Sequence, residues 1–270
     1  MDTSKHNEFQ RSGEHTRDMD ALKKTKEELE AIYNSRKEGE RVDLRNVILE
    51  DMDLSGWDLS NTDFSGASFT NMIFDGANMD SCNIFGTWFF ENNSMKNVKL
   101  TNSDMREAGM RRVDMSGMDI SGSNVYAACF EYTKQDGLIY DENTEWYEMK
   151  CPPEGEAFIC WKCCTDLRVV QMLVPRDAKR VMATQETGRT NKVKVLSIKS
   201  IDESESFDWA QSTVDPDFYY DVGQWLEPAN GFEEDRWRDS SQGIHFFLER
   251  QQCVNYQAPP ELQTETDGRW

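Results

Sequence analysis

Several signatures that often reveal a protein's role are missing from this 270-residue chain. The N-terminus has no apolar run typical of a signal peptide, and no apolar stretch approaches the roughly 18–20 residues that span a bilayer. There is no glycine-rich phosphate loop, G-x-S-x-G elbow, H-E-x-x-H pair or spaced acidic metal triad. We therefore expect a cytoplasmic protein with no membrane partner, name no catalytic residue and no cofactor, and favour a non-enzymatic role.

Basic side chains are also scarce. The chain has 30 lysine and arginine residues against 50 aspartate and glutamate residues, which gives a formal net charge of −20. Such a surface repels the phosphates of duplex DNA and of anionic membranes. The charge therefore predicts no direct binding to duplex DNA. It favours a partner protein with a basic surface, unless the acidic residues serve solubility alone.

A five-residue period runs through residues 42–132. Large apolar residues occupy every fifth position, with one residue inserted after Phe89, and the residue two positions earlier is often small. Neither a helix nor a strand has this period, so successive repeats must stack, and four of them make one coil. The inward positions are Leu44, Leu49, Leu54, Leu59, Phe64, Phe69, Phe74, Met79, Ile84, Phe89, Met95, Leu100, Met105, Met110, Met115, Ile120, Val125 and Phe130.

Two stretches carry a family resemblance. "SGASF" (Ser65 to Phe69) and "DGANM" (Asp75 to Met79) each match two positions of the consensus of Ala, then Asp or Asn, then Leu or Phe. Residues 42–132 thus resemble the pentapeptide-repeat proteins, and the resemblance implies a right-handed quadrilateral β-helix. The insertion beside Trp88, Phe89 and Phe90 predicts a bulged corner, in which these aromatic residues form either a packed kink or an exposed contact patch.

The remaining segments complete a mainly β protein. Residues 1–41 read as a flexible arm followed by an amphipathic helix, from about Asp18 to Arg36, that caps the open end of the coil. Residues 133–150 read as a connector with little regular structure. Short apolar runs predict a small β-rich α+β domain over residues 151–256, and residues 257–270 read as a polar tail.

The C-terminal domain carries a second resemblance. "CPPEGEAFICWK", "LVPRDAKRVMAT" and "GIHFF" occur in an order similar to that of a domain of unknown function that follows pentapeptide repeats in bacteriophage proteins. The resemblance implies a phage-encoded protein that acts in the cytosol of a host cell. It brings no established chemistry with it.

Cysteine and histidine suggest one metal-site hypothesis. Cys160 and Cys163 have C-x-x-C spacing, and Cys151 and His245 would complete a tetrahedral zinc site. Only one such pair exists, and the stretch reads as a buried strand in which cysteine is a small apolar residue. The sequence therefore favours buried, reduced thiols over a metal, because a cytosolic protein keeps its cysteines reduced.

A basic cluster gives a second candidate site. Its residues lie within a short part of an otherwise acidic domain and would suit a phosphate-bearing ligand. The alternative for the basic residues is that they pair with the acidic stretch from Asp202 to Asp239. The alternative for His245, which lies on an apolar strand, is that it is a hydrogen-bonded residue of the core. The candidate ligand-binding residues are Arg176, Lys179, Arg180, Arg189, Lys192, Lys194 and His245.

Three functions remain open. The first is a protein-interaction module, including an acidic, DNA-mimicking inhibitor of a host defence or DNA-handling protein, which the family resemblance implies. The second is a C-terminal domain that binds or processes a phosphate-bearing ligand, and the third is an assembly component. The oligomeric state is left open. The candidate partner-binding residues are the outward Asp53, Asp58, Asp63, Asp104, Asp114 and Asp119.

Overall fold

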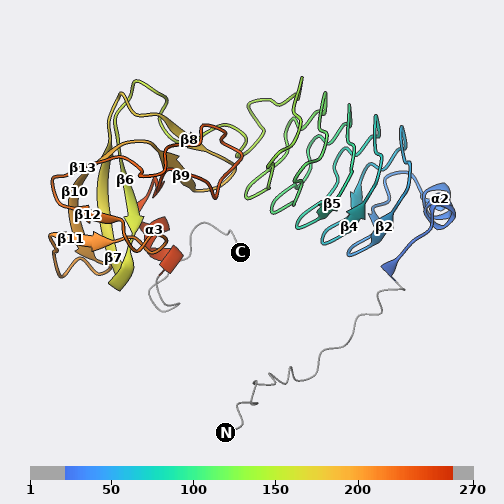
Figure 1. Ribbon diagram of the computed structural model, residues 1–270. Helices are drawn as coiled ribbons and strands as arrows, with labels where there is room; N and C mark the ends of the chain where they lie inside the picture. The colour runs from blue at the N-terminus through green and yellow to red at the C-terminus, as the bar shows by residue number, and fades with distance from the viewer. Residues whose placement is uncertain (1–21, 258–270) are drawn as a thin grey trace, which may run out of the picture.

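A computed structural model describes residues 22–257 and shows a mainly β protein in two parts. Figure 1 shows a row of stacked coils, with helix α2 at one end and a separate β-rich domain at the other. Residues 1–21, with the predicted arm and the start of the predicted helix, lie outside the described residues, as do residues 258–270 of the predicted tail over 257–270.

Parallel bridges between successive coils confirm the five-residue period. They join residues 20 or 21 positions apart, as in the ladder from Asp53 through Ile73 and Ser94 to Asp114. Four repeats therefore make one coil. The longer pairings are also parallel: β1 (Val42–Asp43) pairs with β3 (Thr62–Asp63), and β4 (Ser68–Thr70) pairs with both β2 (Ile48–Glu50) and β5 (Trp88–Phe90).

The interior of the coil is the predicted one. All eighteen inward residues are at most 5% exposed. Phe69 lies among three other rings, with centroid distances of 5.5 Å to Phe64, 5.3 Å to Phe74 and 5.1 Å to Phe89. Full burial of such a side chain contributes about 1.5–3 kcal/mol, so the stack of rings is a main source of the coil's stability.

The inserted residue is accommodated by a buried amide rather than by an open bulge. Asn93 is 4% exposed. Its Nδ2 donates to the carbonyls of Phe69 (3.2 Å) and Phe90 (2.6 Å), and its Oδ1 accepts from the backbone N–H of Met72 (2.9 Å). Asn93 therefore satisfies the backbone groups that the longer corner leaves without strand partners.

The coil is longer than the sequence predicted. Bridges continue from Asp114 to Lys134, from Asp119 to Ile139 and from Asn124 to Glu145. Residues 133–145 therefore add repeats, and the interpretation of 133–150 as an irregular connector is corrected. The apolar pattern ends because the last inward positions meet the C-terminal domain rather than another coil.

Helix α2 (Lys26–Ser35) packs against the first coil. Thr25 and Glu28 form a capping box at its N-terminus. Leu29 is 1% exposed and belongs to the apolar core of the coil, and Ile32 and Tyr33 pack against that core. The amphipathic pattern predicted a helix from about Asp18 to Arg36; the structure describes this stretch from residue 22 on, and there α2 covers Lys26–Ser35.

The C-terminal domain is built on an antiparallel sheet of seven strands in the order β13-β10-β7-β6-β14-β9-β8. One apolar cluster includes Cys160, Met172 and Phe246, and a second lies beneath helix α3. The elements are β6 (Phe158–Cys163), η1 (Thr165–Leu167), β7 (Arg168–Val174), β8 (Arg180–Met182), β9 (Thr187–Thr190), β10 (Val193–Ser200), β11 (Trp209–Gln211), β12 (Tyr219–Asp221), β13 (Trp225–Leu226), β14 (Ile244–Phe247) and α3 (Arg250–Gln257).

The two parts of the molecule meet at the last coils. The ring of Trp237 packs on Phe130 at a centroid distance of 5.3 Å. The Ala127 N–H donates to the Thr184 carbonyl (2.9 Å), and Thr184 Oγ1 donates to the Ala128 carbonyl (2.7 Å). The C-terminal domain therefore covers this end of the coil with both apolar and backbone contacts.

Candidate functional site

The six candidate aspartates do not form one surface. Asp53 and Asp114 lie on one ladder of bridges, Asp58 and Asp119 on a second, and Asp63 and Asp104 on a third. Because each ladder marks a different side of the coil, the six carboxylates face three directions. A single partner surface therefore cannot engage all of them at once.

Each of these carboxylates supports its own turn. Asp53 accepts the N–H of Ser55 (2.9 Å), Asp104 that of Arg106 (3.1 Å), and Asp119 that of Ser121 (3.0 Å). Asp58, Asp63 and Asp114 accept from the residue two positions on in the same way. This local hydrogen bond is the physical reason for aspartate at that position of the repeat.

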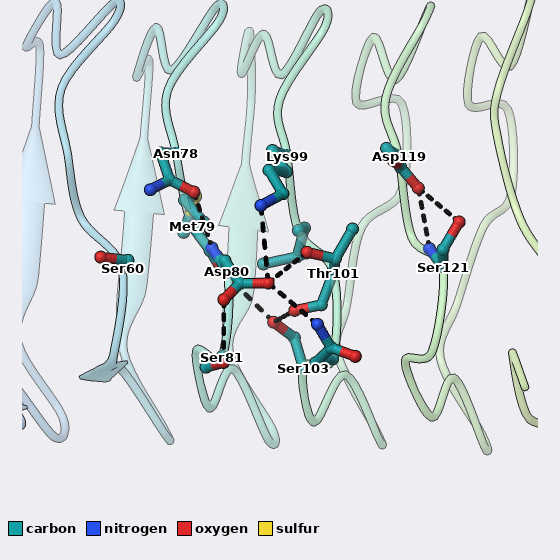
Figure 2. A network of polar contacts seen from close by, with 12 residues as sticks. Ser60, Asn78, Met79, Asp80, Ser81, Lys99, Thr101, Ser103, Asp119 and Ser121 are labelled. Carbon is teal, nitrogen blue, oxygen red and sulfur yellow. Dashed lines mark hydrogen bonds and ion pairs between the residues drawn. The ribbon is translucent and has the colours of Figure 1, made fainter.

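Figure 2 shows how far this polar network extends on the side that carries Asp119. The carboxylate of Asp80 accepts hydrogen bonds from Thr101 Oγ1, from Asn102 Nδ2 (3.0 Å) and from Ser81 Oγ (3.0 Å). The bond from Thr101 is the main cause that lowers the pKa of Asp80, just as the bond from Ser55 lowers that of Asp53. These carboxylates are held ionised by the coil itself.

Basic side chains neutralise much of the remaining charge. Nitrogen–oxygen distances are 2.8 Å for Arg36 with Asp58 and 2.7 Å for Arg106 with Asp104. Asp63 pairs with Arg41, and Asp114 pairs with both Lys96 and Lys134. Four of the six candidate aspartates therefore carry a basic partner, and the outer surface of the coil is no uninterrupted acidic stripe.

The fourth side of the coil differs, because it presents aromatic rings. On β5, Phe89 points inward while Trp88 and Phe90 are 55% and 47% exposed, with their rings stacked at a centroid distance of 6.3 Å. A Cβ on Gly109 would lie 2.6 Å from Trp88, so the indole rests on the bare backbone of the next coil. Two residues of the cluster, Trp88 and Phe90, are therefore exposed, whereas Phe89 is buried, and a contact with a partner stays a prediction. We name Trp88 and Phe90 the aromatic pair.

In the C-terminal domain, the two central arginines of the basic cluster bind backbone carbonyls. Arg180 donates to the carbonyls of Pro153 (2.7 Å), Glu156 (2.8 Å) and Pro175 (2.7 Å). Arg189 donates to those of Glu233 (2.7 Å), Asp235 (2.9 Å) and Gln242 (3.0 Å). The register between β8 and β9 places the two arginines in adjacent pairs, on opposite faces of the sheet.

The other members of the basic cluster are dispersed. Lys179 pairs with Glu234, which lies in the acidic stretch that the sequence offered as a partner. Lys192 pairs with Asp177 at 2.8 Å, Lys194 lies over the ring of Trp225, and Arg176 is exposed. The structure therefore does not bring the cluster together as one phosphate-binding pocket.

The four candidate metal ligands are also separated. Cys160 is fully buried in one apolar cluster, and Cys163 lies in the other. Side chains alternate between the two faces of a strand, so residues three positions apart point to opposite faces. Cys163 is in disulfide contact with Cys253, with a Cα–Cα distance of 5.8 Å, and so differs from the reduced state expected of all the cysteines. Burial raises the pKa of Cys151 and Cys160. Residues 22–257 contain no group of three or more His, Cys, Asp or Glu placed to hold a metal ion.

His245 lies in a half-buried site on β14. A hydrogen bond of 3.0 Å joins its Nε2 to the Ser241 carbonyl, which requires the proton on that nitrogen. Burial lowers the pKa of the imidazole, so the ring is neutral near pH 7. His245 also lines a pocket whose other walls come from outside the basic cluster.

Comparison with known families matches both parts of the molecule. The model of pentapeptide repeats matches residues 40–71 and 53–87, and a family of unknown function (DUF5758) matches residues 147–253. The first part of the N-terminal coil is thus similar to pentapeptide repeats. The region similar to DUF5758 follows the coil along the chain, and we call it the DUF5758 domain.

Solved structures resemble the chain at low identity. Rfr23 of the cyanobacterium Cyanothece 51142 is 20% identical over 36% of this chain and 63% of its own length, with a TM-score of 0.27. HetL of Nostoc PCC 7120 is 16% identical over 37% and 48%, with a TM-score of 0.23. QnrB1, a plasmid-mediated fluoroquinolone resistance protein, is 18% identical over 40% and 68%, with a TM-score of 0.22. The chain thus spans less than two thirds of the first two proteins.

Two further searches gave negative results. No curated protein matches the chain. Between residues 22 and 257, no helix is both long enough and apolar enough to cross a bilayer.

Sequence reasoning missed one residue of the DUF5758 domain. Lys162 lies on β6 and lines the same pocket as His245. A signal was present, because Lys162 is the single charge within the apolar run from Ala157 to Cys164. A charge in such a strand is costly to bury unless something compensates it.

Proposed function

We propose that this protein is a non-enzymatic protein-interaction module, and that the aromatic pair is its anchor for a partner with a basic surface. Tryptophan is enriched at binding hot spots and phenylalanine at protein interfaces, and a stacked pair also offers its ring faces to lysine or arginine. Glu91 adjoins the pair in sequence, and the net charge of −20 attracts a basic partner. The exposure of Trp88 and Phe90 is the observation that carries this proposal.

An acidic inhibitor that mimics DNA is the narrower form of this function. In that form the partner is a host defence or DNA-handling protein, met in the host cytosol if the chain is phage-encoded. The candidate aspartates give it weak support, because they face three directions and most of them pair with basic side chains. We therefore assign the direct contact with the partner to the aromatic pair. The carboxylates would attract a basic partner only through long-range electrostatic forces.

The rest of the molecule presents this anchor on a rigid support. We infer that the repeat segment is a right-handed quadrilateral β-helix, that α2 caps its first coil and that the DUF5758 domain closes its last. Leu29 and Trp237 supply the apolar contacts at the two ends. Covered ends leave no open edge for end-to-end stacking, which weighs against the assembly function.

The test compares two variants of the full chain in a tagged pull-down from host lysate, with identification of the captured proteins by mass spectrometry. The double variant Trp88→Ala/Phe90→Ala removes the anchor. Phe85→Ala is the matched control, because Phe85 is an exposed aromatic residue (37%) of the coil outside the aromatic pair. Loss of a hot spot weakens binding by at least about 2 kcal/mol, or roughly thirtyfold.

We expect the same basic protein to be captured by the wild type and by Phe85→Ala, and lost with the double variant. Capture that survives the double variant would contradict the proposal. Repeating the capture at low and high salt separates the two forms, because a DNA mimic requires strongly salt-sensitive binding.

A further inference from the structure

The DUF5758 domain contains a pocket that neither the basic cluster nor the repeat segment uses. Its volume is about 180 Å³. The walls come from the segment after β11, the loop after β13 and the start of β14, together with Lys162 on β6. Apolar residues such as Phe218 and Ile244 alternate on these walls with polar ones such as Asn230. This mixture is typical of sites for small organic ligands.

The pocket lies where two neighbouring strands of the sheet part. β6 and β14 share a single register pair, Phe247 with Trp161. Lys162 and His245 both follow that pair on the same side, where no further pair joins the two strands. The pocket therefore opens at a break in the ladder that the fold itself provides.

Two polar side chains at the pocket are without partners. Lys162 makes no hydrogen bond or ion pair with any residue between 22 and 257, and burial lowers the pKa of its ammonium group. Tyr220 is only 2% exposed, and its hydroxyl makes no hydrogen bond within the same part of the chain. Within residues 22–257, the fully buried side-chain atoms without a hydrogen-bond partner are the Nε atoms of Arg168, Arg180 and Arg236, so the polar atoms of Lys162 and Tyr220 are accessible from the pocket. Both can donate a hydrogen bond to a ligand there.

We propose that this pocket binds a small organic monocarboxylate, with Lys162 Nζ as its cationic contact and the Tyr220 hydroxyl as a second donor. A cavity of about 150 Å³ accommodates benzene, so the pocket suits a carboxylate with an apolar body of that size. Asp215 stands on the wall and repels a dianion such as a phosphate ester. One cation and one hydroxyl match the charge and the two oxygens of a carboxylate.

The other titratable groups of the pocket are already engaged. Asp215 accepts the N–H of Asp217 at 3.0 Å, within its own turn. The neutral imidazole of His245 donates to Ser241, as described above. Lys162 is therefore the group that the ligand compensates.

The test is a titration of the full chain with sodium benzoate, followed by saturation-transfer NMR and calorimetry. Lys162→Met removes the cation and keeps an apolar stem of similar length, and we expect this variant to fold because the half-buried lysine forms no ion pair within residues 22–257. Lys194→Met is the matched control, because Lys194 is a half-buried lysine on the same sheet that does not line the pocket. Inorganic phosphate serves as the second probe.

We expect benzoate to bind the wild type and Lys194→Met equally and to bind Lys162→Met at least tenfold more weakly, with no binding of phosphate. Benzoate should also raise the pKa of the Lys162 ammonium group, measured from its own NMR signals. Undiminished binding to Lys162→Met would overturn the proposal. So would failure of the wild type to bind benzoate at millimolar concentration, or a preference for phosphate.

Discussion

The repeat segment and the DUF5758 domain reach a folded interior by opposite routes. In the repeat segment each inward side chain meets neighbours five or about twenty residues away, as Phe69 meets Phe74 and Phe89. In the domain, β14 near the end of the chain lies between β6 and β9. The difference teaches that a short period encodes its own packing, whereas the domain depends on contacts between distant parts of the sequence.

The hydrogen bonds of polar side chains differ between the two parts in the same way. In the repeat segment, aspartates accept N–H groups two residues ahead, as Asp53 does from Ser55. In the domain, Arg189 holds the carbonyls of a loop more than 40 residues later in the chain. The first kind of bond repeats with the sequence, and the second occurs once. We expect variants of the two kinds to differ in the size and reach of their effects.

The largest effect should come from the core of the repeat segment. Phe69→Ala removes a ring that contacts three others and leaves a cavity where the coils cannot collapse. Such a change costs about 3–5 kcal/mol of unfolding free energy. Urea unfolding followed by circular dichroism measures it. A loss below about 1 kcal/mol would show that the coil is loosely packed.

A smaller but more localised effect is expected from Arg189→Met. This variant removes the donor of three part-buried hydrogen bonds to backbone carbonyls, at about 2–4 kcal/mol in total. Hydrogen exchange should increase over residues 228–243 while the repeat segment keeps its protection. Arg176→Met, an exposed arginine of the same cluster, is the control and should change nothing. Equal effects from both variants would argue against the structural role of Arg189.

Two glycines of the repeat segment test the stacking of its corners. Gly76 and Gly117 have the same φ of +69°, but a Cβ at Gly76 meets open space and a Cβ at Gly117 meets the amide of Asn97 on the preceding coil. Both Gly→Ala variants lose about 1–2 kcal/mol for the left-handed backbone. Gly117→Ala should lose about 1 kcal/mol more, because the side chain is overpacked. Identical melting temperatures would mean that Asn97 moves aside freely.

The smallest effect concerns acid. Hydrogen bonds from Arg45 lower the pKa of Asp43 to about 2, and a bond from Thr101 lowers that of Asp80. A carboxyl whose pKa is lower in the folded state stabilises the fold above its unfolded pKa, and this contribution is lost as pH falls. The repeat segment should therefore lose stability between about pH 4 and pH 2.

Urea midpoints measured across that range check the acid prediction, with Asp43→Asn as the variant that should flatten the dependence. In the domain, burial is the main cause that raises the pKa of Asp239, so its contribution has the opposite sign. A repeat segment that gains stability on acidification would contradict this account.

The sequence alone predicted the interior of the repeat segment, because every fifth residue of the pattern is also a residue that points inward. Every inward residue from Leu44 to Phe130 is buried as predicted. The pattern failed at residues 133–145, where the positions that continue the period hold Gln135, which is half-buried, and Tyr140, which is 42% exposed. There the interior is covered by Trp237, more than 90 residues along the chain, and no local period reveals such a contact.

The candidate sites were harder to predict for the same reason. The outward aspartates look like a surface when read along the chain, but the coil distributes them over three sides. The basic cluster is compact in sequence, yet strand alternation sends Arg180 and Arg189 to opposite faces. Lys162 becomes notable only when loops from three other parts of the domain enclose it.

The central claim is that the aromatic pair, rather than the paired aspartates, contacts the partner. Site-specific photocrosslinking tests it most directly, with p-benzoylphenylalanine placed at Phe90 in one protein and at Phe85 in a second. We predict a crosslinked host protein from position 90 and none from position 85. Adducts from position 85 alone, or from neither position, would contradict the claim.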